Sequence, residues 1–145
     1  MSYYIRYISI DETPTSLPEL VAMLNVENPG YSLEDSTLSF NGRELADIEV
    51  NRAGEELFEE EIVELIEFAE AIESEDPNQA IGQERVLDGL RAATEIIAFQ
   101  ILSAGEEKTF ELLEPVWGCL DLNRKGMLQA DQQGYFIAGE LVLAE

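Results

Sequence analysis

The sequence predicts an α+β fold, in which a small antiparallel sheet from the N-terminal third packs against about three to four helices. Three observations predict it. Residues 1–50 contain short alternating apolar runs, residues 55–120 show helical periodicity, and residues 121–145 hold turn residues between β-prone runs. We expect one domain over residues 1–145, with the helices on one face of the sheet.

The chain begins with a predicted strand followed by a helix. Residues 3–10 alternate and are rich in Tyr and Ile, which favours a strand. Ser16 followed by Glu19 forms a capping-box pattern that starts a helix, and residues 28–30 (Asn-Pro-Gly) end it.

A hairpin is predicted around Asn41-Gly42, because this dipeptide stands between two alternating apolar runs. Two registers are open, since a two-residue loop pairs Phe40 with Arg43 and a three-residue loop with a bulge pairs Phe40 with Glu44. We favour the second register, because it places the apolar residues of both strands on one face.

Residues 55–76 predict an acidic amphipathic helix that begins after Gly54. Apolar residues occupy about half of its circumference, and Leu57 and Phe68 belong to that half. This segment has no Lys or Arg, and its carboxylates are Glu55, Glu56, Glu59, Glu60, Glu61, Glu64, Glu67, Glu70, Glu73, Glu75 and Asp76.

A second long helix is predicted from Asp76, which precedes Pro77 as an N-cap, through to residue 104. Residues 92–104 are apolar nearly all round, so they are expected to form a core helix or the contact of a homodimer. A short helix is then predicted over residues 106–114, ending at Pro115.

The tail, residues 121–145, is open to two interpretations. Turn residues separate three short β-prone runs at 127–131, 135–137 and 141–143, which favours a hairpin packed on the core. The alternative is a loop followed by a helix, which Gly134 and Gly139 would weaken.

Charge and composition exclude several classes of function. Acidic residues outnumber basic ones 31 to 8, which disfavours direct binding to nucleic acid or to an anionic membrane and favours a basic protein partner. Surface adaptation to strong salt is another explanation of the acidity. The chain has no histidine, the usual general base and the commonest metal ligand, so we expect a non-catalytic protein without a cofactor. One cysteine, Cys119, and no apparent secretory signal indicate a cytoplasmic protein.

The acidic helix supplies the candidate interaction site. We expect its polar face to bind a basic partner by electrostatic steering, with an exposed apolar residue for local contact, in an adaptor, inhibitor or immunity-type role. Ordinary solvation of an amphipathic helix is the simplest alternative. The candidate contact residues are Glu56, Glu59, Glu60, Val63, Glu64, Glu67 and Glu70.

Glu61 is the most unusual single residue, because it lies on the apolar side of the predicted helix. A carboxylate there needs solvent, an arginine partner or a raised pKa. Four arginines are candidate partners: Arg6, Arg43, Arg85 and Arg91. An enzyme that uses carboxylates alone, with Glu61 as the titrating group, is a further alternative.

Residues 121–132 resemble an EF-hand calcium loop. Asp121 and Asn123 match the first and third ligand positions, and Gly126 matches the required glycine. Two residues depart from the motif: Lys125 puts a cation where an oxygen ligand belongs, and Gln132 replaces the bidentate glutamate. The resemblance implies Asp121, Asn123 and Asp131 as candidate ligands for a divalent cation.

Overall fold

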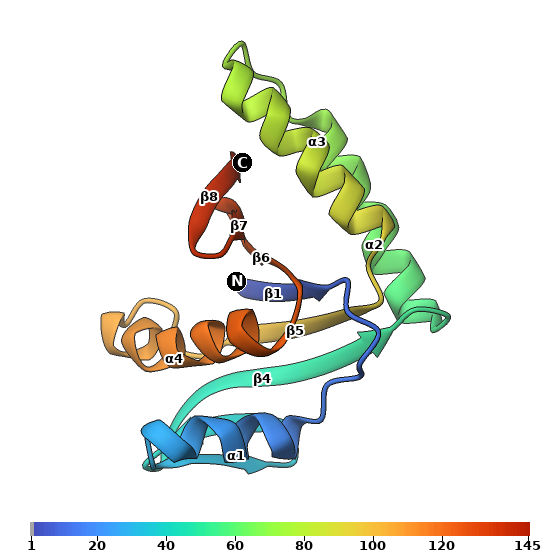
Figure 1. The fold of residues 1–145 in the computed structure, drawn as a ribbon. Coiled ribbons are helices and arrows are strands. Elements are labelled where there is room, and N and C mark those ends of the chain that lie inside the picture. Colours follow the sequence, from blue (N-terminus) through green and yellow to red (C-terminus); the bar gives the residue numbers. More distant parts are fainter. Residues whose placement is uncertain (1) are drawn as a thin grey trace.

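A computed structural model describes residues 2–145 and contains four α-helices and one eight-stranded antiparallel sheet (Figure 1). The strand order is β2-β3-β4-β5-β1-β6-β7-β8. This confirms the predicted α+β fold. In chain order the elements are β1 (Tyr4–Ser9), α1 (Leu17–Glu27), β2 (Tyr31–Glu34), β3 (Thr37–Phe40), β4 (Arg43–Arg52), α2 (Glu56–Ala71), α3 (Pro77–Arg91), β5 (Glu95–Ile101), α4 (Glu107–Asn123), β6 (Gly126–Ala130), β7 (Gly134–Ile137) and β8 (Glu140–Ala144).

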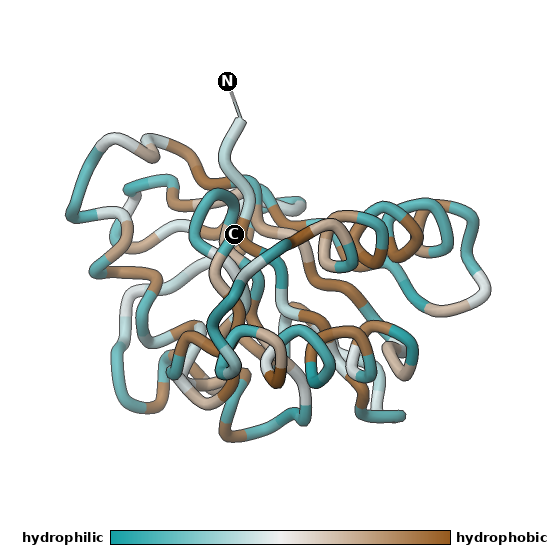
Figure 2. Tube along the Cα trace, turned by 90° about the horizontal axis from the view of Figure 1, so that it is seen from above, coloured by the Kyte–Doolittle hydropathy of each residue, from teal (hydrophilic) through white to brown (hydrophobic). Residues whose placement is uncertain are grey.

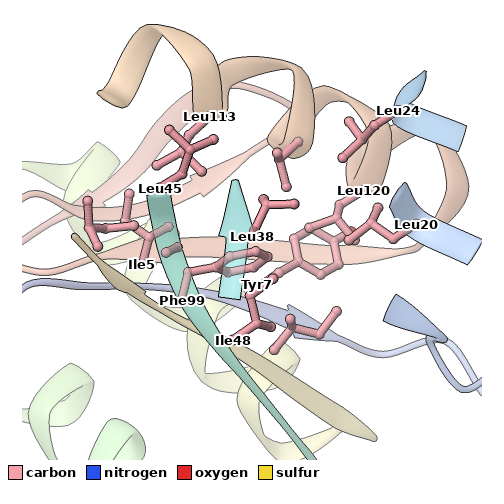
Figure 3. Close-up of a cluster of buried hydrophobic side chains, with 14 of the residues drawn as sticks. Ile5, Tyr7, Leu20, Leu24, Leu38, Leu45, Ile48, Phe99, Leu113 and Leu120 are labelled. Carbon is pink, nitrogen blue, oxygen red and sulfur yellow. The ribbon is translucent and has the colours of Figure 1, made fainter. Parts of the chain in front are cut away.

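The helices cover both faces of the sheet, so the prediction that they share one face is wrong. On one face, a buried cluster contains Leu20 of α1, Leu113 of α4 and Phe99 of β5 (Figure 3). On the other face, Phe58 of α2 and Val86 of α3 belong to a second buried cluster. Hydrophilic and hydrophobic residues alternate along the helices, as expected for helices with one buried side (Figure 2).

The largest error of the sequence prediction concerns β5, which was predicted as the second half of a long helix. The helix ends at Arg91, and residues 95–101 form a strand between β4 and β1. Ile96 contributes to one core and Ile97 to the other, and both are fully buried. A strand covered on both faces can be apolar at consecutive positions, as β5 is at residues 96–99, so its sequence shows no alternation there. The segment is therefore part of the core, as one of the two predictions for residues 92–104 stated, but it is a strand and not a helix.

The hairpin between β3 and β4 has the register that we did not favour. Phe40 pairs with Arg43, and the two-residue turn has positive φ values at Asn41 (48°) and Gly42 (85°). The bulge lies further along β4, where Ser39 pairs with Glu44 and Leu38 with Ala46. This shift still buries Leu38 and Ala46 in one core, so the predicted face is right and the position of the bulge is wrong.

The helix predicted to end at Pro115 instead continues to Asn123 as α4. A proline within a helix removes one backbone hydrogen bond and usually kinks or ends it. Here Leu113, Val116 and Leu120, on both sides of Pro115, are buried in one core. The packing of this continuous apolar face outweighs the local cost of the proline.

The tail forms β6, β7 and β8, which confirms the predicted hairpin. β6 pairs with β1 at the centre of the sheet, and β8 forms one sheet edge. Helix α3 lies against this edge, where the Gln79 side chain exchanges two hydrogen bonds with the backbone of Ala144. The C-terminal strands thus connect the centre of the sheet to α3 (Figure 1).

Candidate functional site

Helix α2 carries the candidate interaction residues, and two glutamates at its start accept hydrogen bonds from the backbone of the segment that precedes it. The Glu55 side chain accepts a hydrogen bond from the backbone N–H of Arg52. The Glu59 side chain accepts one from Gly54 N–H at 3.2 Å. These bonds satisfy donors near the positive end of the helix, so Glu55 and Glu59 have a structural role there.

All seven candidate contact residues are exposed, and we call them the acidic face of α2. Within it, Glu56, Glu60, Val63 and Glu67 follow one another at spacings of three or four residues. This spacing places them along one line of the helix. The opposite side of α2 is buried in the core through Phe58, Ile62, Leu65 and Ala69.

Few basic residues neutralise this face. Glu70 forms an ion pair with Arg91 of α3, with an N–O distance of 3.7 Å. Among residues 2–145, Glu56, Glu60, Glu64 and Glu67 form no ion pair, because the chain's other ion pairs lie elsewhere. These four carboxylates of α2 are therefore open to an external cation.

Three large apolar side chains of α2 are exposed beside these carboxylates. The exposed fractions are 56% for Leu57, 51% for Val63 and 71% for Phe68. The expectation that Leu57 and Phe68 belong to the buried half of the helix is wrong. Together with Val63 they offer apolar contact next to charge.

Glu61 lies on the sheet side of α2, as predicted, and its partner is Arg6 of β1. The Arg6 Nε lies 3.2 Å from Glu61 Oε2, and the two side chains are 16% and 25% exposed. Arg6 Nη1 also donates to Asp131 at 2.9 Å and to the Gln129 side chain at 2.7 Å. The Tyr4 ring lies 5.1 Å from the guanidinium carbon. Glu61 is thus one member of a network that joins α2 to the sheet.

This network keeps Arg6 charged although its side chain is mostly buried. Burial alone would lower the pKa of Arg6, but the hydrogen bond and charge of Asp131 and the charge of Glu61 outweigh it and raise the pKa. The other Glu61 oxygen, Oε1, is buried and has no hydrogen-bond partner among residues 2–145. Glu61 therefore has acceptor capacity that the fold does not use.

A cavity of about 390 Å³ lies beside this network, lined by residues of α2, β1 and the C-terminal strands. We call it the Arg6 cavity. Leu65 and Phe68 of α2 line it, together with Ile72, which directly follows the helix. Sequence reasoning found Glu61 but missed Gln129, Tyr135 and the cavity itself, because these residues meet only through long-range strand pairing. An enzyme that uses Glu61 would need a pocket with further polar groups, and it would need a Glu61 that is not simply paired with an arginine. The first condition is met by the Arg6 cavity, and the second is not, because Glu61 pairs with Arg6.

The candidate ligands of the EF-hand-like segment are not brought together. Asp121 and Asn123 belong to the last turn of α4, and Asp131 follows the strand β6. Five strand residues span about 16 Å at about 3.3 Å per residue, so β6 separates Asp131 from the helix end. Asp131 pairs with Arg6 instead. Within residues 2–145, no group of three acidic, histidine or cysteine residues could hold a metal ion.

Cys119, the single cysteine, is half-buried on α4. Burial raises the pKa of its thiol, and the hydrogen bond from Asn123 and the charge of Arg124 only partly oppose this. A raised pKa disfavours the thiolate, which is the reactive form.

Comparison with known proteins gives no match to a family model, to a curated protein or to a solved structure. None of the helices within residues 2–145 has the length and apolar character that crossing a bilayer requires.

Proposed function

We propose that this protein is a non-catalytic interaction module that binds a basic protein through the acidic face of α2. Adaptor, inhibitor and immunity-type roles would all use such a surface. The observation that supports this most is the set of four exposed carboxylates, Glu56, Glu60, Glu64 and Glu67, without an ion-pair partner within residues 2–145.

Binding would begin with long-range attraction. The net charge of −23 raises the rate of encounter with a cationic protein, and the acidic face of α2 concentrates part of that charge on a rigid helix. Because exposed charges are screened by salt, the affinity should fall steeply as ionic strength rises.

Apolar contact would then give the complex its lifetime. Val63 lies within the acidic face, and Leu57 and Phe68 flank it. Exposed aromatic and aliphatic side chains, once covered by a partner, contribute more binding energy than charges at an interface rim. Helix α2 is also firmly anchored to the sheet, so little order would have to be gained on binding.

The test is affinity capture from the native cell extract on the immobilised full chain, with elution by a salt gradient. A triple variant, Glu60→Lys with Glu64→Lys and Glu67→Lys, is expected to lose about 100-fold or more in affinity for the retained partner, because like charges then face one another. Retention of no basic protein by the natural chain would contradict the proposal.

A matched control separates local from overall charge. Glu27, Glu44 and Glu140 are exposed and lie outside α2. Their triple replacement by Lys changes the net charge by the same six units and should leave most of the affinity intact. Equal loss in both triple variants would show that overall charge, and not the acidic face, attracts the partner.

A further inference from the structure

The Arg6 cavity combines an apolar wall with unneutralised negative charge. Phe68, Leu65 and Ile72 supply the wall, and Phe68 is 71% exposed. Four carboxylates line the cavity, Glu61, Glu64, Asp131 and Glu145, against a single cation, Arg6. A small apolar recess with such an excess of carboxylates is suited to a ligand with an aliphatic stem and a cationic end.

Arg6 itself shows how this part of the molecule holds a guanidinium. It lies over an aromatic ring, that of Tyr4, and it donates to two carboxylates and to the amide oxygen of Gln129. These bonds use Asp131 and one oxygen of Glu61. Glu64 has no ion-pair partner within residues 2–145, and the Oε1 atom of Glu61 accepts no hydrogen bond there.

The unused groups repeat the same combination on the outer side of the cavity. Phe68 provides an exposed ring and Glu64 an exposed carboxylate without an ion-pair partner within residues 2–145, and the two lie on one side of α2 four residues apart. A planar guanidinium can stack on a ring and donate two parallel hydrogen bonds to a carboxylate, which an ammonium group cannot do.

We propose that the Arg6 cavity receives an arginine side chain of the partner protein, an inference that rests on the proposed function and specifies its chemistry. The aliphatic stem of that arginine would pack against Phe68 and Ile72, and its guanidinium would bind Glu64. Arg6 would stay in place, because its own partners are separate from the free groups.

The test uses N-acetyl-arginine amide as the probe, titrated into the ¹⁵N-labelled full chain and followed by NMR. Saturable shifts are expected at the backbone amides of Glu64 and Phe68. The neutral isostere N-acetyl-citrulline amide should bind at least about tenfold more weakly, because it keeps the shape but loses the charge. Absence of saturable shifts, or equal binding of the citrulline compound, would overturn the proposal.

Three variants localise the effect. Glu64→Gln and Phe68→Ala should each weaken arginine-amide binding about tenfold. Glu60→Gln removes the same charge from the line of α2 that does not contact the cavity, and it should leave this affinity unchanged. An equal loss of affinity for the arginine amide in Glu60→Gln and Glu64→Gln would show that general charge causes the binding, and it would overturn the proposal that the cavity is the binding site. Each residue is exposed, so a thermal melt of each variant is expected to match the natural chain.

Failure here can be told from failure of the proposed function. Suppose that the double variant Glu60→Lys with Glu67→Lys loses affinity for a captured basic protein while Phe68→Ala keeps it. In that case the acidic face binds the partner, and the proposal that the Arg6 cavity receives an arginine is wrong. If neither variant alters binding, the proposed function is wrong as well.

Discussion

The guanidinium of Arg6 on β1 lies 3.2 Å from the carboxylate of Glu61 on α2, and this ion pair connects the acidic helix to the centre of the sheet. The same guanidinium bonds Asp131, which follows β6. One arginine thus joins three parts of the chain that are far apart in sequence, and it does so next to the most acidic surface of the molecule.

Replacing Arg6 by Met should lower the free energy of unfolding by about 2–3 kcal/mol, because Glu61 and Asp131 then remain partly buried without a cation. Urea denaturation measures this. Arg85→Met is the control, since Arg85 is exposed and forms no ion pair within residues 2–145, and its effect should stay within about 0.5 kcal/mol. An equal loss of unfolding free energy in the two variants would show that the stability depends on net charge and not on the ion pairs of Arg6.

Glu95 is a second buried carboxylate with a structural role. It is 2% exposed, and its Oε2 accepts hydrogen bonds from Thr15 N–H and from Arg52 Nε, each at 3.0 Å. Glu95→Ala should cost about 2 kcal/mol, because the buried Thr15 N–H loses its acceptor. Glu49→Ala, on the exposed side of the neighbouring strand, should change stability by less than about 0.5 kcal/mol in the same denaturation experiment.

Gly82 tests the contact between α3 and the edge strand β8. A Cβ at this position would lie 1.6 Å from the carbonyl oxygen of Val142, so Gly82→Ala must displace backbone and should destabilise by about 2 kcal/mol or more. Gly118 lies within α4 with open space around it, so Gly118→Ala should stabilise by about 0.5–1 kcal/mol. Thermal melts of the two variants should therefore move in opposite directions; a shift of the same sign would contradict this packing.

Tyr7 predicts a dependence of stability on alkaline pH. Burial raises the pKa of its hydroxyl above the ordinary value of 10.0, with a smaller contribution from Asp121. The Tyr7 hydroxyl ionises more easily in the unfolded chain than in the folded protein. Its contribution to the free energy of unfolding is therefore complete below pH 10 and is lost as the pH rises above 10. Burial raises the pKa of Tyr135 in the same way.

The Tyr7 hydroxyl is also buried without a hydrogen-bond partner within residues 2–145. Tyr7→Phe should therefore raise the free energy of unfolding at pH 7 by about 1 kcal/mol and reduce the loss of stability above pH 10. Denaturation curves at several pH values measure both effects. A destabilised Tyr7→Phe protein at pH 7 would show that the hydroxyl has a partner.

Local signals in the sequence predicted the start of α3 and the strands of the tail, although the Asn41-Gly42 turn did not determine the register of its hairpin. Asp76 caps α3 by accepting the N–H of Asn78 at 2.9 Å, as its position before Pro77 predicts. The turn residues of the tail likewise predict β6, β7 and β8. These features depend on a few neighbouring residues, so no knowledge of the rest of the chain is needed.

The errors occur where distant segments decide the structure. Residues 95–101 are a strand because β1 and β4 pair with them on both sides, and their apolar composition alone also fits a buried helix. The Arg6 cavity likewise exists only because β1, α2 and the C-terminal strands meet. Helical periodicity identified Glu61 as unusual, and the scarcity of basic residues suggested four arginines as its partner. The pairing of the strands places Arg6 beside it.

The most direct test of the central claim is the affinity of the full chain for its captured basic partner, measured by calorimetry at increasing salt concentration. We expect the affinity of the natural chain to fall steeply with salt, and the control variant with Lys at positions 27, 44 and 140 to show the same fall. The variant with Lys at positions 60, 64 and 67 should not bind the partner. Binding that is independent of salt, or unchanged by the reversal on α2, would contradict it.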